Sequence, residues 1–207
     1  MARLWMLIMG AIRGEGKLSA ICHQPRLRRR RVEISRPDII ANVGGAMAAD
    51  VKDKALREHL LYLLKGGGAH AGFDAAVKGL PAPLRGKRPE GAEHSPWEFV
   101  EHMRIAQWDI LEFSRNAKHK SPDWPGGYWP KTPAPPNGAA WNKSVRAFQA
   151  DLKAMCQLVK RSSTDLYARI PHGDGQTILR EALLVADHNA YHLGQLVLVR
   201  RLLGAWK

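Results

Sequence analysis

The sequence predicts an all-α protein, a four-helix bundle with an appendage. Apolar residues recur at helical spacing in four long segments of about 22–29 residues. No segment has the short alternating pattern that is typical of a strand. The chain has 207 residues, 45% of them hydrophobic. That composition allows one substantial core, in a single domain or at most two small ones.

The first 46 residues differ from the rest of the chain. They hold nine Lys or Arg and three Asp or Glu, including the run from Arg26 to Arg31. They lack the helical period of the four long segments, which predicts a disordered basic extension outside the fold. Met47 is a candidate true start of translation, and a leader peptide is the alternative. We therefore expect the bundle to comprise residues 47–207.

The net charge of +13 suggests a nucleic-acid partner at first sight. Outside residues 1–46, however, the basic residues are spread along the chain without a Lys/Arg run or a zinc-finger or RNA-binding signature. Nucleic acid is therefore an unfavoured partner, and we expect no membrane association. The two cysteines, Cys22 and Cys156, offer neither a disulfide framework nor a cysteine-based zinc site. A reducing cytoplasm is the expected location.

The first helix of the bundle is expected over about 50–78. Its apolar face comprises Leu56, Leu60, Leu63 and Leu64. Three glycines at 66–68 interrupt the pattern, which predicts a kink or a close backbone approach. His70 follows directly. It is a candidate pocket residue, with an exposed histidine beside a turn as the alternative.

The second helix begins at a recognisable N-terminal signal. Ser95 and Glu98 form a capping box, with a proline at the first helical position between them. Further along, His102 and Asp109 lie in an otherwise apolar stripe, and buried polar groups need partners. His102 is a candidate metal ligand. The alternative is a core histidine bonded to Asp109 or to a backbone carbonyl.

A connection over 117–136 comes next, rich in Pro and Trp. It is longer than the 2–8 residues usual between bundle helices, and it can cross the bundle end to end. Parallel neighbouring helices are then possible. Its aromatic residues either cover a pocket or pack over the bundle surface. The third helix, about 137–161, has a regular apolar stripe that includes Cys156 and is typical of a scaffold helix.

The last helix is expected from about Thr177 to Leu203 and carries His188 and His192. Residues four apart share a helix face, so the two imidazoles suit one metal ion. Two half-buried histidines with ordinary partners are the alternative. If this helix runs antiparallel to the second, His102 lies at about the same height, since each residue adds roughly 1.5 Å. Three nitrogen ligands would leave positions open for water or substrate.

Three further residues lie close enough to support such a site. Gln195 is one turn beyond His192 and can orient a ligand. Asp109 and Glu181 each lie two turns from a proposed ligand, within range of a supporting or proton-transfer role. Arg104 and Arg200 are candidate cations for an acidic cosubstrate at the rim, with solvated helix-surface arginines as the alternative.

The sequence around these histidines resembles a known family. His102 lies within Trp-Glu-Phe-Val-Glu-His-Met-Arg-Ile-Ala-Gln-Trp-Asp, and the second motif is Asp-His-Asn-Ala-Tyr-His-Leu-Gly-Gln over 187–195. Together they resemble the DinB/YfiT-like metalloenzymes over about 47–206. The resemblance implies up-down-down-up connectivity and a divalent metal, often zinc or nickel, held by the histidines at 102, 188 and 192. It does not imply DNA binding.

Some members of this family use a low-molecular-weight thiol. The resemblance therefore implies a metal-dependent thiol S-transferase or isomerase acting on a small electrophile. A metal-dependent hydrolase and a non-enzymatic metal-binding bundle are the alternatives. The expected partner is a small-molecule substrate, and a homodimer is possible.

Overall fold

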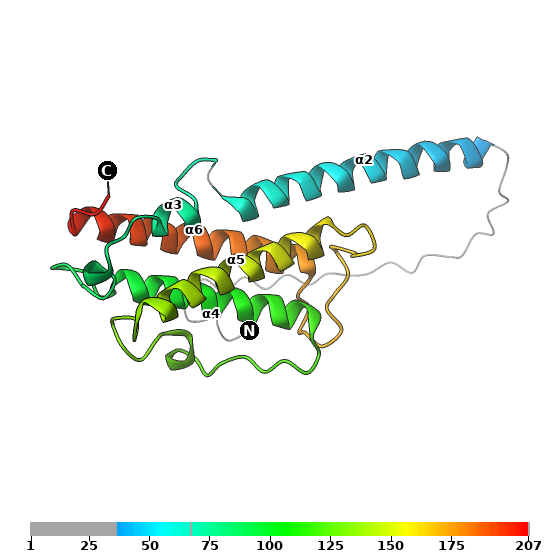
Figure 1. Ribbon diagram of the computed structural model, residues 1–207. Coiled ribbons are helices and arrows are strands. Elements are labelled where there is room, and N and C mark those ends of the chain that lie inside the picture. Colours follow the sequence, from blue (N-terminus) through cyan, green and yellow to red (C-terminus); the bar gives the residue numbers. More distant parts are fainter. Residues whose placement is uncertain (1–36, 67, 207) are drawn as a thin grey trace, which may run out of the picture. The chain divides into compact units, whose positions relative to one another are not determined.

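The computed structural model describes residues 37–66 and 68–206, with side chains from Asp50 onward. The described chain is helical, and its only β-type pairing is a single bridge between Arg169 and Thr177. The all-α class is therefore confirmed. The helices are α2 (Pro37–Lys65), α3 (Phe73–Val77), α4 (Pro96–Arg115), α5 (Gly138–Lys160) and α6 (Ile178–Leu202), as Figure 1 shows. Two short 3₁₀ turns, η1 (Ala82–Leu84) and η2 (Gly126–Tyr128), lie in the connections.

The chain divides into two units, Met1–Ala55 and Leu56–Lys207. The described part of the first unit is the N-terminal portion of α2. That helix begins at Pro37, earlier than the expected start near Asp50, so residues 37–46 of the predicted basic extension are helical. Residues 1–36, including the arginine run, lie outside the described residues. The second unit holds the remaining helices.

The helix expected over 50–78 is in fact two helices. α2 ends at Lys65, and α3 begins only at Phe73. Gly66 comes directly after α2 with a φ of 64°, a left-handed conformation that commonly ends a helix. The sequence predicted an interruption at the glycines, and the helix does end at that position. The continuation of one helix beyond them was wrong.

The last turns of α2 belong to the second unit and pack into it. Leu60 and Leu64 are buried, whereas Leu63 of the expected apolar face is 51% exposed. Arg57 donates hydrogen bonds to the carbonyl oxygens of Val159 and Thr164, which lie around the end of α5. The bond to Val159 satisfies one of the carbonyl groups that the end of a helix leaves without an intrahelical partner.

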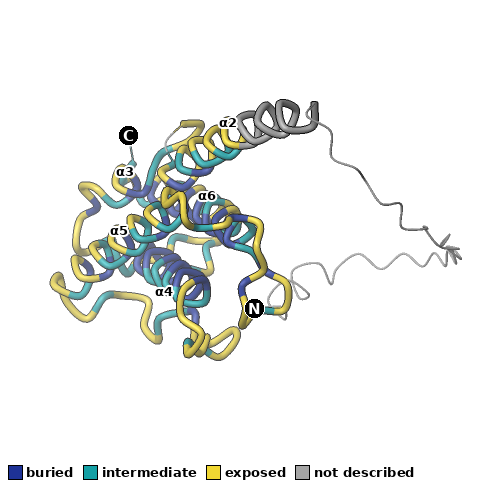
Figure 2. The backbone as a smooth tube through the Cα atoms, turned by 90° about the vertical axis from the view of Figure 1, so that its right-hand side faces the viewer, coloured by how far each residue is buried: buried dark blue, intermediate teal, exposed yellow. Residues whose placement is uncertain are grey.

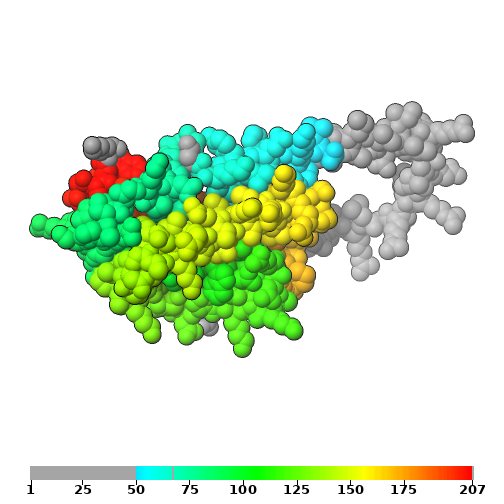
Figure 3. All heavy atoms as spheres, in the orientation of Figure 1, coloured from blue at the N-terminus to red at the C-terminus, as the bar shows by residue number. Residues whose placement is uncertain are grey.

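Three helices, α4, α5 and α6, make the centre of the second unit. α4 contacts both of the others extensively, and buried residues line their facing sides (Figure 2). In the space-filling view, α5 runs across the face toward the reader (Figure 3). The apolar core includes Val100, Met103, Leu111, Phe148, Leu193 and Leu196.

Side-chain hydrogen bonds fix the direction in which these helices run. On α4 and α5, Glu101 pairs with Ser144 and Gln107 with the Phe148 carbonyl, so residue numbers rise together and the helices are parallel. Between α4 and α6 the residue numbers change in opposite directions, because Gln107 pairs with Asn189 while His102 faces His192. These two helices are therefore antiparallel. The long connection from Arg115 to Gly138 is what makes the parallel pair possible, since the chain must return to the same end.

The helix starts have the expected capping chemistry. Ser95 accepts a hydrogen bond from the Glu98 backbone, and the Glu98 carboxylate accepts one from the Ser95 backbone, so the predicted capping box is confirmed. Asn137 caps α5, and Thr177 caps α6. Within the described residues, no helix combines the length and apolarity needed to cross a membrane.

Candidate metal centre

Three histidine side chains meet between α4 and α6. His102 lies two turns into α4, and His188 and His192 lie one turn apart on α6. The Nε2 atom of His102 is 3.1 Å from the Nε2 atoms of both other rings. Ligand atoms of all three lie within 4.8 Å of one another, and no other such cluster of three His, Cys, Asp or Glu occurs in the described chain. The structure thus brings together the three residues that the sequence selected.

The far side of two rings shows which nitrogen carries the proton. His102 Nδ1 lies 2.9 Å from the Tyr128 carbonyl oxygen, and His192 Nδ1 lies 2.6 Å from Gln195 Oε1. Because a carbonyl oxygen only accepts hydrogen bonds, each Nδ1 must donate its proton. In the neutral ring Nε2 then has a free lone pair. Two lone-pair nitrogens therefore face each other at the centre of the cluster.

This donor set fits a metal ion. Two nitrogen acceptors 3.1 Å apart repel each other unless a cation or proton lies between them. Zinc binds imidazole at about 2.0–2.1 Å, which separates tetrahedral ligand atoms by roughly 3.3 Å. The fixed proton on the opposite ring nitrogen is also the arrangement found in metal-binding histidines. The residues could therefore hold a divalent metal with little rearrangement.

Burial keeps these rings neutral at physiological pH. Desolvation lowers the pKa of His102 to about 4, and it also lowers the pKa values of His188 and His192. The neighbouring imidazoles lower the pKa of His188 further, because a second positive charge would repel the first. Neutral imidazole is the form that binds a metal ion.

An aromatic side chain of the long connection covers the cluster. Trp129 stacks on His102 with ring centroids 3.9 Å apart and planes 4° from parallel. On its other face it stacks on His94, also at 3.9 Å. Of the two roles expected for these aromatics, Trp129 takes that of a cover. Phe99 and Tyr191 approach His192 with centroids at 6.0 and 4.9 Å, so aromatic rings also lie beside this histidine.

Asp109 supports the cluster from a distance and makes no hydrogen bond to it. Its fully buried carboxylate accepts hydrogen bonds from His119 Nε2 at 2.7 Å and from the Tyr128 hydroxyl at 2.6 Å. Burial and this carboxylate raise the pKa of Tyr128. Since the Tyr128 carbonyl accepts from His102, Asp109 anchors the segment that orients that ring. A proton-transfer role at the cluster does not fit this geometry.

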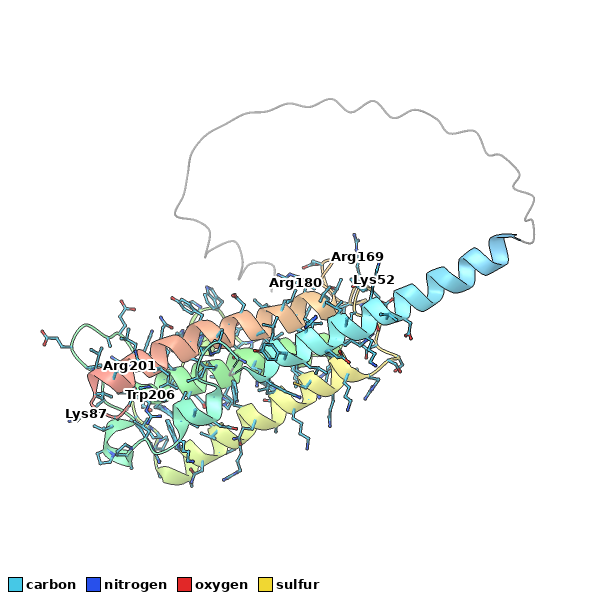
Figure 4. The ribbon with its side chains drawn as sticks, turned by 90° about the horizontal axis from the view of Figure 1, so that it is seen from above. Lys52, Lys87, Arg169, Arg180, Arg201 and Trp206 are labelled. Carbon is cyan, nitrogen blue, oxygen red and sulfur yellow. The ribbon has the colours of Figure 1, made fainter. Side chains whose placement is uncertain are left out.

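Glu181 lies on α6 toward its N-terminal end and is fully buried. One oxygen accepts from Arg180 at 2.5 Å. Its other oxygen makes no hydrogen bond to the described residues. Burial raises the pKa of Glu181, and the nearby Asp109 adds to that rise. Figure 4 labels Arg180 beside the start of α6, away from the end that carries Arg201 and Trp206. No described contact joins Glu181 to the histidines.

His70 lies at a separate cavity. It is exposed, and its Nδ1 is 3.0 Å from the Ala71 carbonyl oxygen. With Phe73, Phe148, Leu183 and Leu193, among others, it lines a cavity of ≈ 380 Å³. None of the three clustered histidines lines this cavity. A role for His70 at the histidine cluster stays a prediction.

The two arginines considered for a cosubstrate are already occupied. Arg200 is 4% exposed and donates to the backbone carbonyls of Ala76 and Ala205. Arg104 pairs with Glu101 on its own helix at 2.6 Å. Both guanidinium groups thus have partners within the protein, and a role for either of them toward a thiol cosubstrate stays a prediction. Their place on helix surfaces gave no sign of these partners.

Four supporting residues were not selected from the sequence. Tyr128 and Trp129 lie in the long connection, and His94 and His119 lie just outside α4. One signal did point to them: a buried aspartate in an apolar stripe requires donors, and the stripe itself supplied none. A connection rich in aromatic residues was the nearest source. Which residues met Asp109 depended on the path of that connection.

The fold and the site together define a class of protein: helical, with a three-histidine cluster buried between two antiparallel core helices. A family model described as the DinB superfamily matches residues 68–196, more than half of the chain. The protein belongs to the DinB superfamily. No curated protein matches the chain, and no solved structure does.

Proposed function

We propose that the protein binds one divalent metal ion, zinc or nickel, through the Nε2 atoms of His102, His188 and His192. The observation that carries this proposal is the pair of facing lone pairs at 3.1 Å, each fixed by a hydrogen bond on the far side of its ring. Imidazole nitrogen suits both metals. With it we propose the up-down-down-up four-helix connectivity of the family for the bundle.

The chain's own residues hold and shield the site. Tyr128 and Gln195 orient the rings of His102 and His192. Trp129 lies flat on His102 and keeps water from that side. When bound, a divalent metal lowers the pKa of a thiol or water that occupies an open position. Three neutral ligands leave the ion its full charge for that effect.

We propose a thiol S-transferase or isomerase acting on a small electrophile as the activity. Among the described residues, the hydrogen-bond partners of the three histidines are the Tyr128 carbonyl, Gln195 and one another, which supports a nucleophile supplied by a cosubstrate. Cys156 lies on α5, and burial raises the pKa of its thiol, which opposes thiolate formation. A small thiol bound at the metal would be deprotonated there.

Hydrolysis is the second candidate, because the same ion would also generate hydroxide from water. Metal-dependent hydrolases commonly add a carboxylate as general base. Here the carboxylate of Asp109 is committed to His119 and Tyr128, and Glu181 has no described contact with the histidines. The transferase is therefore favoured. A metal-binding bundle without activity is the remaining alternative.

The activity is tested by presenting an electrophile, a chlorobimane or an epoxide, with bacillithiol, mycothiol or glutathione. Metal-loaded, metal-free and His188→Ala proteins are compared. Conjugation only by the metal-loaded protein supports the transferase. If none of the three thiols is conjugated and the metal-loaded protein turns over an ester or amide panel, the site is assigned to the hydrolase. Tight metal binding without turnover in either assay assigns the non-enzymatic role. Homodimer formation and a cytoplasmic location stay predictions from the sequence.

A further inference from the structure

A chain of amide side chains crosses the core from α5 to α6. Gln107 Nε2 donates to the Phe148 carbonyl oxygen at 2.8 Å, and Asn189 Nδ2 donates to Gln107 Oε1, also at 2.8 Å. Because the carbonyl only accepts, Gln107 must turn its nitrogen toward Phe148 and its oxygen toward Asn189. Asn189 must in turn direct its own nitrogen toward Gln107. The orientation of both amides is thus fixed by one backbone group.

This order leaves the Asn189 Oδ1 atom as a buried acceptor. It makes no hydrogen bond of normal geometry to the described residues, and the Asn189 side chain is only slightly exposed. The preceding residue, His188, has a buried ring nitrogen that also lacks a partner among the described residues. Its Nδ1 is buried and has no hydrogen bond to the described chain, while its Nε2 faces His102.

We propose that Asn189 is a positioning residue for His188 and accepts the proton of its Nδ1 atom. A hydrogen bond between these two unpartnered buried atoms would hold the imidazole with its Nε2 lone pair directed into the cluster. Each of the three histidines then has its own acceptor: the Tyr128 carbonyl, Gln195 and Asn189. His188 would be tied through Gln107 to the backbone of α5, which otherwise contributes nothing to the cluster. This inference rests on the proposed metal site.

The first test measures the affinity of metal-free protein for Zn²⁺ in competition with a chelator. Asn189→Leu should weaken zinc binding by about tenfold or more, the usual effect of removing a ligand's hydrogen-bond partner. Asn189→Asp should bind zinc much as the wild type does, because its carboxylate still accepts from Nδ1. Gln107→Leu frees the Asn189 amide to rotate and should give an intermediate loss. Val159→Ala leaves a cavity in the core away from this chain of amides. It serves as the control for an effect of lowered stability on zinc affinity.

The second test follows the Nδ1 proton of His188 by NMR in the zinc-loaded protein. It should exchange slowly with solvent in the wild type and rapidly in Asn189→Leu, while the Nδ1 proton of His102 is unchanged. Melting temperatures accompany both measurements. If Asn189→Leu fails to fold, the Asp variant and Gln107→Leu carry the comparison.

Three outcomes would overturn the inference. Unchanged zinc affinity and slow proton exchange in Asn189→Leu would leave the proposed metal site standing and remove the role of Asn189. Equal losses in the Leu and Asp variants, in step with their melting temperatures, would reduce Asn189 to a packing residue. Absence of zinc binding in the wild type would contradict the proposed function as well.

Discussion

At the scale of single residues, Asp109 shows how a buried charge is used for support. Its carboxylate has two donors, His119 and the Tyr128 hydroxyl, and it lies fully inside the second unit. A buried charge is tolerated only when it is paired and hydrogen-bonded. Here the pairing holds the connection between α4 and α5 against α4, and with it the carbonyl that orients His102.

Replacing this carboxylate should lower both stability and metal binding. In Asp109→Asn one acceptor becomes a donor that faces another donor, so the free energy of unfolding should fall by about 1.5–3 kcal/mol. Metal affinity should fall too, because the Tyr128 carbonyl is no longer held. Urea unfolding and a chelator competition measure the two effects. Ser114→Ala removes a buried hydrogen bond within α4 itself and should leave metal affinity unchanged. An effect of the same size in both variants would refute the supporting role.

The histidines also predict a dependence of stability on pH. Burial holds the pKa of His102 at about 4, below the value of about 6.5 expected in an unfolded chain. Between these values the unfolded chain binds more protons than the folded one, so stability falls as pH falls. The contribution of His102 to the free energy of unfolding is fully present above about pH 6.5 and is lost as the pH falls toward 4.

Urea unfolding of the metal-free protein across this range should show that slope. His102→Gln should show a shallower one, since it removes the group with the lowered pKa. Taking the difference between the two proteins cancels the opposing effect of Glu181, whose pKa is raised. Identical slopes would mean that His102 titrates normally in the folded protein.

At the scale of elements, the connection between α4 and α5 is fastened to the start of α4. Ser95 caps that helix by accepting from the Glu98 backbone, and its hydroxyl also donates to the Pro133 carbonyl. One side chain thus both begins a helix and holds the segment that covers the histidines. Thr177 caps α6 through its hydroxyl, and that hydroxyl makes no second hydrogen bond among those described.

These two caps form a matched pair. Ser95→Ala should lower the free energy of unfolding by about 2 kcal/mol, since it removes a cap and a buried hydrogen bond. Thr177→Ala should cost about 1 kcal/mol, the usual value for a cap alone. Thermal or urea unfolding of both variants measures the difference. If Thr177→Ala proved the more damaging, the hydrogen bond to Pro133 would have no net value.

The sequence was informative about elements and about the histidines themselves. Helical periodicity and caps predicted α4, α5 and α6 to within a residue or two, because those signals are local. The spacing of His188 and His192 predicted a shared face for the same reason. The end of α2 was missed, because the three glycines were interpreted as a kink or close approach within one helix, whereas the backbone turns at Gly66. The partners of Asp109 and His102 come from a non-helical connection, whose path no local pattern fixes.

At the scale of the molecule, the second unit contains the core and the site, and the first contributes only part of α2 to the described structure. A shortened chain beginning at Met47 should therefore melt within a few degrees of the full chain and bind the same amount of metal. Differential scanning calorimetry and metal analysis check this. A large drop in melting temperature would show that residues before Met47 support the bundle.

The central claim is that three histidines on two antiparallel helices hold one divalent metal ion. Its most direct test is metal analysis of protein purified without an affinity tag, beside the double variant His188→Ala with His192→Ala. We predict close to one zinc or nickel per chain in the wild type and almost none in the variant, with helicity retained by circular dichroism. Full metal content in the folded double variant would contradict the claim.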